Sequence, residues 1–69
     1  MSKNEKILFE LLKLNGFNPQ RVWYESNFSW HPDRGWYALM ENGEEYKLSR
    51  NYDEAKANIE NKTIKKTEI

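Results

Sequence analysis

The sequence predicts a small two-layer α+β domain, in which a helix, three antiparallel strands and a second helix follow one another and both helices cover one face of the sheet. Three observations carry this prediction. A capped amphipathic segment opens the chain, Asn42-Gly43 lies between two runs of strand-forming residues, and a second capped segment follows Asn51. Because Asn-Gly between such runs is the strongest short-range hairpin signal, the middle of the chain is expected to be antiparallel sheet.

The first helix is expected over residues 3–14. Ser2 and Glu5 have the spacing of a capping box, in which each side chain accepts a hydrogen bond from the other residue's backbone N–H. Four aliphatic residues follow on one helical stripe, which we expect to lie in the core: Ile7, Leu8, Leu11 and Leu12. After Asn15, Gly16 can adopt the left-handed conformation that ends many helices.

The first strand is expected over residues 21–29, after the breaker Asn18-Pro19. Alternation assigns three apolar residues to one face, which we expect to be the core face: Val22, Tyr24 and Phe28. The opposite face is polar except for Trp23. A turn is expected over residues 30–35 and two further strands over residues 36–41 and 44–49.

The hairpin between the second and third strands permits two registers. A two-residue turn pairs Tyr37 with Leu48 and leaves Trp36 on the other face of the sheet. A three-residue loop with a bulge pairs Ala38 with Tyr46 and Trp36 with Leu48, and it leaves Tyr37 outside. The sequence leaves both registers open, but each of them places one aromatic residue on the second face.

The second helix is expected to begin after Asn51, whose side chain can cap it. Asp53 and Glu54 lie in its first turn, where the helix dipole favours acidic side chains. Its inward stripe is expected to consist of Tyr52, Ala55, Lys56 and Ile59. The helix is expected to end at Asn61 or Lys62.

Length and composition exclude several classes of protein. Sixty-nine residues suffice for one domain, expected over residues 1–62, with residues 63–69 as a frayed tail or a short extended segment through Ile64. The absence of cysteine excludes disulfides and thiolate metal sites. Eleven basic and eleven acidic residues cancel, unlike the imbalance of a DNA-coating protein or an acidic DNA mimic. Because no apolar run approaches the roughly 20 residues that span a bilayer, we expect a cytoplasmic protein without membrane contact.

The sequence offers few groups for catalysis. There is one histidine, His31, no serine in a nucleophile elbow and no glycine-rich phosphate loop. The tripeptide His31-Pro32-Asp33 also marks J-domain co-chaperones, but a strand precedes it here instead of that family's long basic helix, which favours a turn. We therefore expect no enzyme, no cofactor, no metal ion and no small-molecule substrate.

The order helix, three strands, helix resembles that of double-stranded-RNA-binding domains. Seven residues fall loosely where that family has comparable ones: Pro19, Tyr24, His31, Trp36, Gly43, Ser49 and Ala55. The resemblance implies binding to RNA. That family opens its last helix with a lysine cluster that contacts phosphates, whereas this chain has Asp53 and Glu54 there.

Residues 35–61 also resemble the DNA-binding arms of phage-type integrases, which contain a tryptophan strand, an Asn-Gly turn and a helix that begins near Asp-Glu-Ala. This resemblance implies DNA binding through a basic sheet. Here Arg21, Arg34 and Lys47 stand against four acidic residues: Glu25, Glu41, Glu44 and Glu45. On these two resemblances nucleic acid is the alternative partner, and the balance of charges ranks it second to a protein.

The leading hypothesis is a non-enzymatic protein that binds another protein stoichiometrically, as an inhibitor or adaptor of the kind that phages and mobile elements encode. Seven of the ten aromatic residues lie between Phe17 and Tyr37, more than one face of a short strand pair needs. Aromatic residues and arginine are enriched at the centres of protein interfaces. Self-association through the open sheet face or an edge strand belongs to the same hypothesis. The expected contact residues are Trp23, Trp30, Trp36, Tyr37, Arg21 and Arg34.

Overall fold

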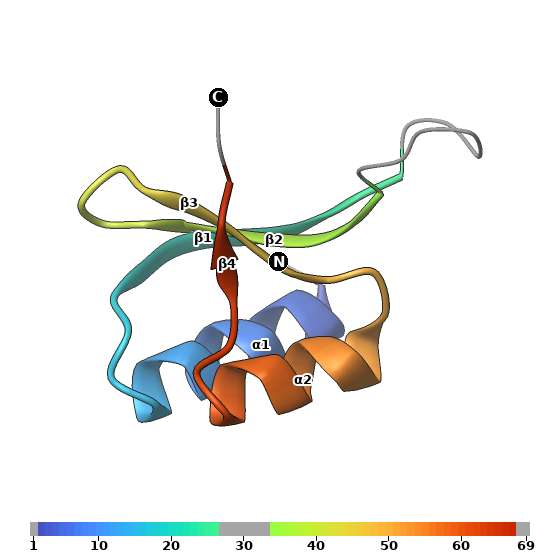
Figure 1. Cartoon of the computed structure of the whole chain (residues 1–69), viewed down its shortest axis with the longest axis horizontal. Helices are drawn as coiled ribbons and strands as arrows, with labels where there is room; N and C mark the ends of the chain where they lie inside the picture. Colours follow the sequence, from blue (N-terminus) through green and yellow to red (C-terminus); the bar gives the residue numbers. More distant parts are fainter. Residues whose placement is uncertain (1, 27–33, 68–69) are drawn as a thin grey trace.

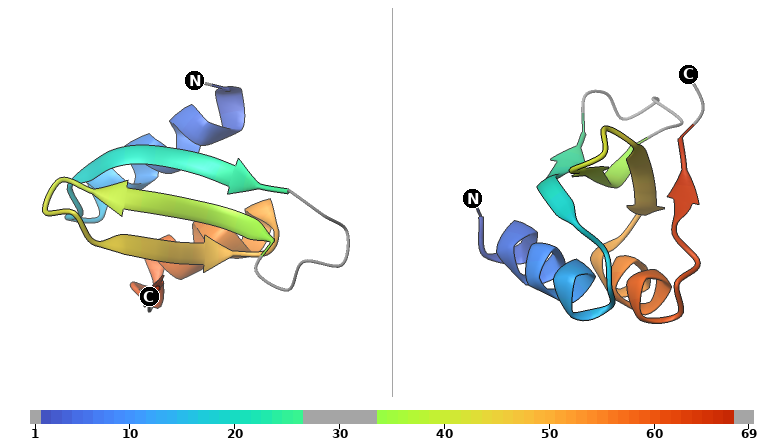
Figure 2. Two further views of the ribbon diagram at one scale, coloured as in Figure 1. Left: turned by 90° about the horizontal axis from the view of Figure 1, so that it is seen from above. Right: turned by 90° about the vertical axis from the view of Figure 1, so that its left-hand side faces the viewer.

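The computed structural model describes residues 2–26 and 34–67 of the chain and confirms the α+β class. An antiparallel sheet with the strand order β1-β2-β3-β4 forms one layer, and two helices form the other, all on the same face of the sheet (Figures 1 and 2). The elements are α1 (Lys3–Leu14), β1 (Pro19–Glu25), β2 (Gly35–Met40), β3 (Glu45–Ser49), α2 (Tyr52–Glu60) and β4 (Lys65–Lys66).

Helix α1 has the predicted bounds and the predicted cap. The Ser2 Oγ accepts from the Glu5 N–H at 3.2 Å, and the Glu5 Oε1 accepts from the Ser2 N–H at 2.9 Å. Leu8 and Leu12 are fully buried, whereas Ile7 is 39% exposed. The expectation that Ile7 belongs to the core is therefore wrong, because α1 directs Leu8 and Leu12 into the core and leaves Ile7 at the surface.

The sheet register follows the longer of the two predicted loops. Ala38 pairs with Tyr46, and the Met40 N–H donates to the Glu44 carbonyl oxygen at 2.8 Å across the turn. A register shift after Trp36 then pairs this residue with Ser49 instead of Leu48. As a result Trp36 faces the helices, and its neighbour Tyr37 faces away from them.

The core lies between the helices and the inner face of the sheet. Its buried members are Leu8, Leu12, Val22, Trp36, Ala38, Met40, Leu48, Ala55 and Ile59. The Trp36 ring contacts Tyr24 at a centroid distance of 5.0 Å and Tyr52 at 5.9 Å. Tyr24 itself is 39% exposed, so it lies at the margin of the core and not within it as expected. Phe28, the third predicted core residue of the first strand, lies outside the described residues.

Helix α2 begins at the predicted cap and is tied to β3 by a side chain. The Asn51 side chain accepts from the Glu54 N–H at 2.9 Å, and the Asn58 amide donates to the Leu48 carbonyl oxygen at 2.7 Å. Ala55 and Ile59 are fully buried, as predicted. Lys56 was expected on the inward stripe, but it lies half-buried at the margin, with its Nζ 4.8 Å from the centroid of the Tyr52 ring.

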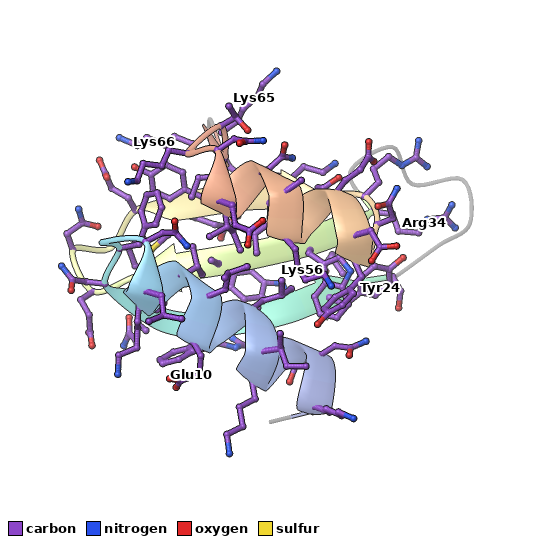
Figure 3. All side chains as sticks on the ribbon, turned by 90° about the horizontal axis from the view of Figure 1, so that it is seen from below. Glu10, Tyr24, Arg34, Lys56, Lys65 and Lys66 are labelled. Atoms are coloured by element: carbon purple, nitrogen blue, oxygen red, sulfur yellow. The ribbon has the colours of Figure 1, made fainter. Side chains whose placement is uncertain are left out.

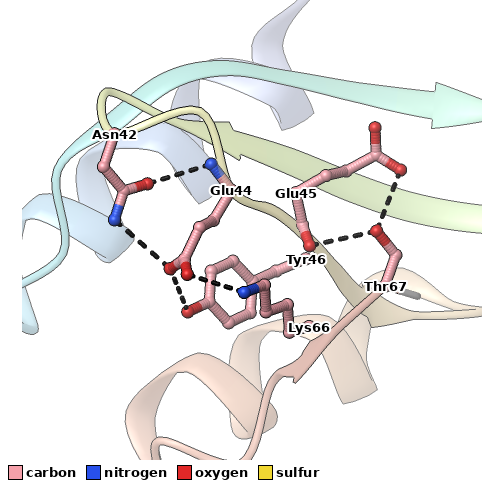
Figure 4. A network of polar contacts seen from close by, with 6 residues as sticks. All are labelled: Asn42, Glu44, Glu45, Tyr46, Lys66 and Thr67. Carbon is pink, nitrogen blue, oxygen red and sulfur yellow. Dashed lines mark hydrogen bonds and ion pairs between the residues drawn. The ribbon is translucent and has the colours of Figure 1, made fainter. Parts of the chain in front are cut away.

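Strand β4 lies where the sequence predicts a tail, and a polar network fastens it to β3 (Figure 4). The Lys66 Nζ lies 2.8 Å from the Glu44 Oε2. Glu44 also accepts from the Tyr46 hydroxyl at 3.1 Å and from the Asn42 amide at 3.2 Å. One residue further along, the Thr67 N–H donates to the Glu45 carbonyl oxygen at 2.9 Å. Residues 65–67 are therefore part of the sheet structure.

The network shifts the pKa values of its three ionisable members, which are Glu44, Tyr46 and Lys66. Each shift favours the hydrogen-bonded state. The hydrogen bond from Lys66, followed by those from Tyr46 and Asn42, lowers the pKa of Glu44 below its ordinary value of 4.5. The hydrogen bond to Glu44 raises the pKa of Lys66 and that of Tyr46. Because the lowered pKa belongs to the acid and the raised ones to its donors, all three contributions are present at neutral pH.

Docking of β4 should therefore weaken in acid. As the pH falls below 4.5 towards the lowered pKa of Glu44, protonation removes its interaction with Lys66. Hydrogen exchange of the Thr67 N–H, followed by NMR and corrected for the intrinsic pH dependence, should lose protection over that range. The variant Glu44→Gln should show the low protection already at neutral pH. Lys65→Met, which leaves the Glu44 contacts intact, should behave as the wild type, and equal protection in all three proteins would refute the network.

Gly35, the first residue of β2, should be harder to replace than Gly43, which lies in the turn after β2. A Cβ at this position would lie 2.6 Å from the Ser49 carbonyl oxygen and 3.0 Å from the Arg50 Cα, and φ is +153°. Gly43 has φ +90° but open space around it. We expect Gly43→Ala to lower the free energy of unfolding by about 1–2 kcal/mol and Gly35→Ala to lower it by about 1–3 kcal/mol more, because backbone must move. Urea unfolding of both variants tests this, and equal losses would show that the close approach to Ser49 is absent in solution.

Candidate interaction surfaces

The face of the sheet opposite the helices is the first candidate site, and we call it the outer face (Figure 2, left). Within the described part of the chain, no helix covers it. Alternate residues of β1, β2 and β3 project from it: Arg21, Trp23, Glu25, Tyr37, Leu39, Glu45 and Lys47.

A row of two rings and two cations crosses the outer face. Trp23 and Tyr37 are direct cross-strand partners, and their rings stack with centroids 5.9 Å apart and planes inclined by 16°. The Arg21 guanidinium carbon lies 4.9 Å from the centroid of the Trp23 ring, and the Lys47 Nζ lies 5.7 Å from that of Tyr37. The Trp23 Nε1 donates to the Glu25 Oε1 at 2.8 Å. The row is therefore ordered by the protein itself, without a partner.

This order decides how the rings can be used. Tyr37 is only 7% exposed, because its neighbours on both strands cover it, and Trp23 is half-buried. A nucleobase that stacked on the side of Trp23 where Arg21 lies would have to displace the guanidinium. Trp23 and Leu39, which are both half-buried, form the accessible apolar area. The charges around them balance, with Arg21 and Lys47 against Glu25 and Glu45.

Three of the six predicted contact residues meet on the outer face, namely Arg21, Trp23 and Tyr37. Trp36 lies in the core and is 9% exposed, so the choice between Trp36 and Tyr37 falls to Tyr37. Arg34 is half-exposed and directly precedes β2, at one end of the sheet (Figure 3). Trp30 lies outside the described residues.

A basic cleft adjoins the outer face. It lies between β3, α2 and β4 and is lined by Lys47, Leu48, Ser49, Arg50, Asn58, Thr63 and Lys65. Three of these residues are cations, and the lining contains no acidic residue. Lys47 and Lys65 are cross-strand partners. Sequence reasoning missed this cleft because it requires β4, and two consecutive lysines give no strand signal.

An apolar groove runs along the helix layer, on the side of the molecule opposite the outer face, and we call it the helix groove. It is lined by Lys6, Ile7, Glu10, Leu11, Leu14, Lys56 and Glu60. Leu14 is 82% exposed, the most of the large hydrophobic residues in the described chain. Its spacing of seven residues from Ile7 is visible in the sequence, but the sequence does not show which apolar line of α1 the sheet covers.

Chemical sites of other kinds find little support. In residues 2–26 and 34–67, no three side chains of the types His, Cys, Asp and Glu are placed to hold a metal ion together. His31 lies outside these residues. Neither α1 nor α2 has the length and apolar character needed to cross a bilayer.

Comparisons with models of known protein families, with characterised proteins and with solved structures find no match for this chain. The two families named above on the basis of element order therefore gain no support from them. Function has to be inferred from the surfaces that the chain itself presents.

The Trp23–Tyr37 stack should stabilise the free protein. In a double-mutant cycle with Trp23→Leu and Tyr37→Leu, we expect a coupling free energy of about 0.5–1.5 kcal/mol, as for other aromatic pairs. The measurement is the free energy of unfolding in urea. The matched control pairs Trp23→Leu with Tyr52→Leu, which removes a ring of α2 on the helix side of the sheet, and should give additive losses. Additive losses for Trp23 and Tyr37 would show that the two rings do not stack in solution.

Proposed function

We propose that this protein is a small non-enzymatic binding protein that docks a protein partner on its outer face. The observation that carries the proposal is the ordered row Arg21–Trp23–Tyr37–Lys47 on the outer face, which neither helix of the described residues covers. The protein would act stoichiometrically, as an inhibitor or adaptor. Such small stoichiometric proteins are of the kind that phages and mobile elements encode.

The composition of the outer face supports a protein partner. Tryptophan, tyrosine and arginine are the residue types that most often dominate the binding energy of protein interfaces. Here one of each lies together on the outer face, and the glutamates Glu25 and Glu45 add acceptors on the same face. A surface with both signs of charge is typical of the polar rim of a protein–protein interface, whereas a phosphate backbone would favour a basic surface.

The order of the row also supports binding. Association costs free energy for each side chain that it immobilises, on the order of 0.5–1.5 kcal/mol for a flexible one. Trp23 is already held by Arg21, by Tyr37 and by the hydrogen bond to Glu25, so little rotamer freedom remains to be lost. A partner would therefore meet a rigid aromatic anchor.

The basic cleft favours a second candidate, nucleic-acid binding. Successive cross-strand partners form one line across the sheet from β1 to β4, namely Trp23, Tyr37, Lys47 and Lys65. Two aromatic residues are therefore next to two cations. Proteins that bind single strands combine rings with a basic groove in this way. Arg50 would extend the groove.

Substitutions on the two surfaces separate the candidates. With a partner captured from the source cell and then purified, Trp23→Ala should weaken binding by about 30-fold or more, the effect of a central interface residue. Lys65→Ala and Arg50→Ala should change it little. The measurement is isothermal titration calorimetry, with circular dichroism to verify that each variant folds.

A labelled single-stranded oligonucleotide provides the opposing test. Fluorescence anisotropy at low and at moderate salt should show no specific binding if the outer face binds protein. Binding that weakens steeply with salt and is lost in Lys65→Ala and Arg50→Ala would replace the leading proposal by the second candidate.

A further inference from the structure

Helix α1 carries two apolar lines, and the core buries only one of them completely. Leu8 and Leu12 occupy the buried line. Ile7, Leu11 and Leu14 form the other at the spacing i, i+4, i+7, which is the spacing with which one helix packs against another. Ile7 and Leu14 are two of the three large hydrophobic residues that are exposed in the described chain, and both line the helix groove.

The charges around the helix groove change sign along its length. Helices α1 and α2 run in the same direction in the lower layer of Figure 1. On each helix a lysine of the groove lining, Lys6 or Lys56, is followed one turn later by a glutamate, Glu10 or Glu60. The parallel helix dipoles have the same polarity, positive at the N-terminal ends and negative at the C-terminal ends.

We propose that the helix groove is a homodimer interface, occupied by the helix layer of a second copy of this chain. A two-fold axis that runs across the helices would turn the partner end for end. The lysine end of one groove then lies against the glutamate end of the other, and the two apolar lines face each other. A two-fold contact requires a surface that is complementary to itself, and this pattern has that property.

Other occupants fit the pattern less well. A uniformly acidic or basic segment would match one end of the groove and be repelled by the other. An unrelated amphipathic helix would need its own charges in the reverse order. A second copy provides that order by symmetry alone.

The dimer would have a consequence for the outer face. The helix layer and the outer face lie on opposite sides of the molecule (Figures 1 and 2), so a dimer through the helices presents two outer faces that point away from each other. The assembly would be bivalent towards a repeated partner. The dimer itself does not depend on the proposed function of the outer face.

Sedimentation equilibrium over a range of protein concentrations tests the dimer. The wild type should show a monomer–dimer equilibrium. Leu14→Glu should weaken dimerisation at least about tenfold, because it places a charge where the dimer would bury a leucine. Leu14 is so exposed in the monomer that its replacement should leave the fold intact. The matched control Gln20→Glu adds the same charge at the exposed start of β1 and should dimerise as the wild type does.

A charge-swap pair tests the orientation. Lys6→Glu with Lys56→Glu makes the groove acidic throughout, and Glu10→Lys with Glu60→Lys makes it basic throughout, so each double variant alone should be monomeric. An equimolar mixture should form a heterodimer, which native mass spectrometry can identify. Circular dichroism of each double variant verifies that both helices are intact, so that a monomeric state cannot come from lost helices.

Three outcomes would overturn the proposal. They are a wild type that remains monomeric at every concentration, double variants that dimerise as the wild type does, and a mixture that stays monomeric. A wild type that dimerises as expected but binds no protein partner on its outer face would contradict the proposed function and leave the dimer proposal intact.

Discussion

The register of β2 is the constraint on which the rest of the structure depends. This strand is central in the sheet, and almost all of its residues are buried, on both faces. A shift by one residue would exchange the faces of Trp36 and Tyr37. The large indole would then leave the core beneath Tyr24 and Tyr52, and the stack on Trp23 would lose its partner. The three-residue loop and the bulge after Trp36 together prevent this exchange.

The sequence predicted the elements whose signals are local. Helix caps at Ser2 and Asn51 depend on residues three positions apart, so a short window contains all the information needed to place both helices. The hairpin register could not be predicted, because Asn42-Gly43 suits two turns of different length and each leaves an aromatic residue on the second face. Tyr24 was assigned to the core by alternation alone, which cannot show how far along the strand the helices reach.

Strand β4 and the two clefts show a second limit. Lys65 and Lys66 have low strand propensity, and they pair with Lys47 and Tyr46 of β3, which lie about twenty positions earlier in the chain. The basic cleft exists only because this pairing brings Lys65 beside Lys47. The helix groove, in contrast, was present in the sequence as the spacing of Ile7 and Leu14. It was concealed because the two apolar lines of α1 overlap into one broad stripe.

Because side chains alternate along the strands, the many aromatic residues are distributed over both faces of the sheet. Trp36 and Tyr24 fill the side towards the helices, and Trp23 and Tyr37 form the outer face. Because a domain this small buries only roughly 60% of its unfolded surface, it cannot enclose every ring in one core. The second face must then either tolerate a half-buried tryptophan or use it. The cation, the stacked ring and the carboxylate hold Trp23 in one orientation, which stabilises the sheet and also leaves little rotamer freedom for a partner to remove.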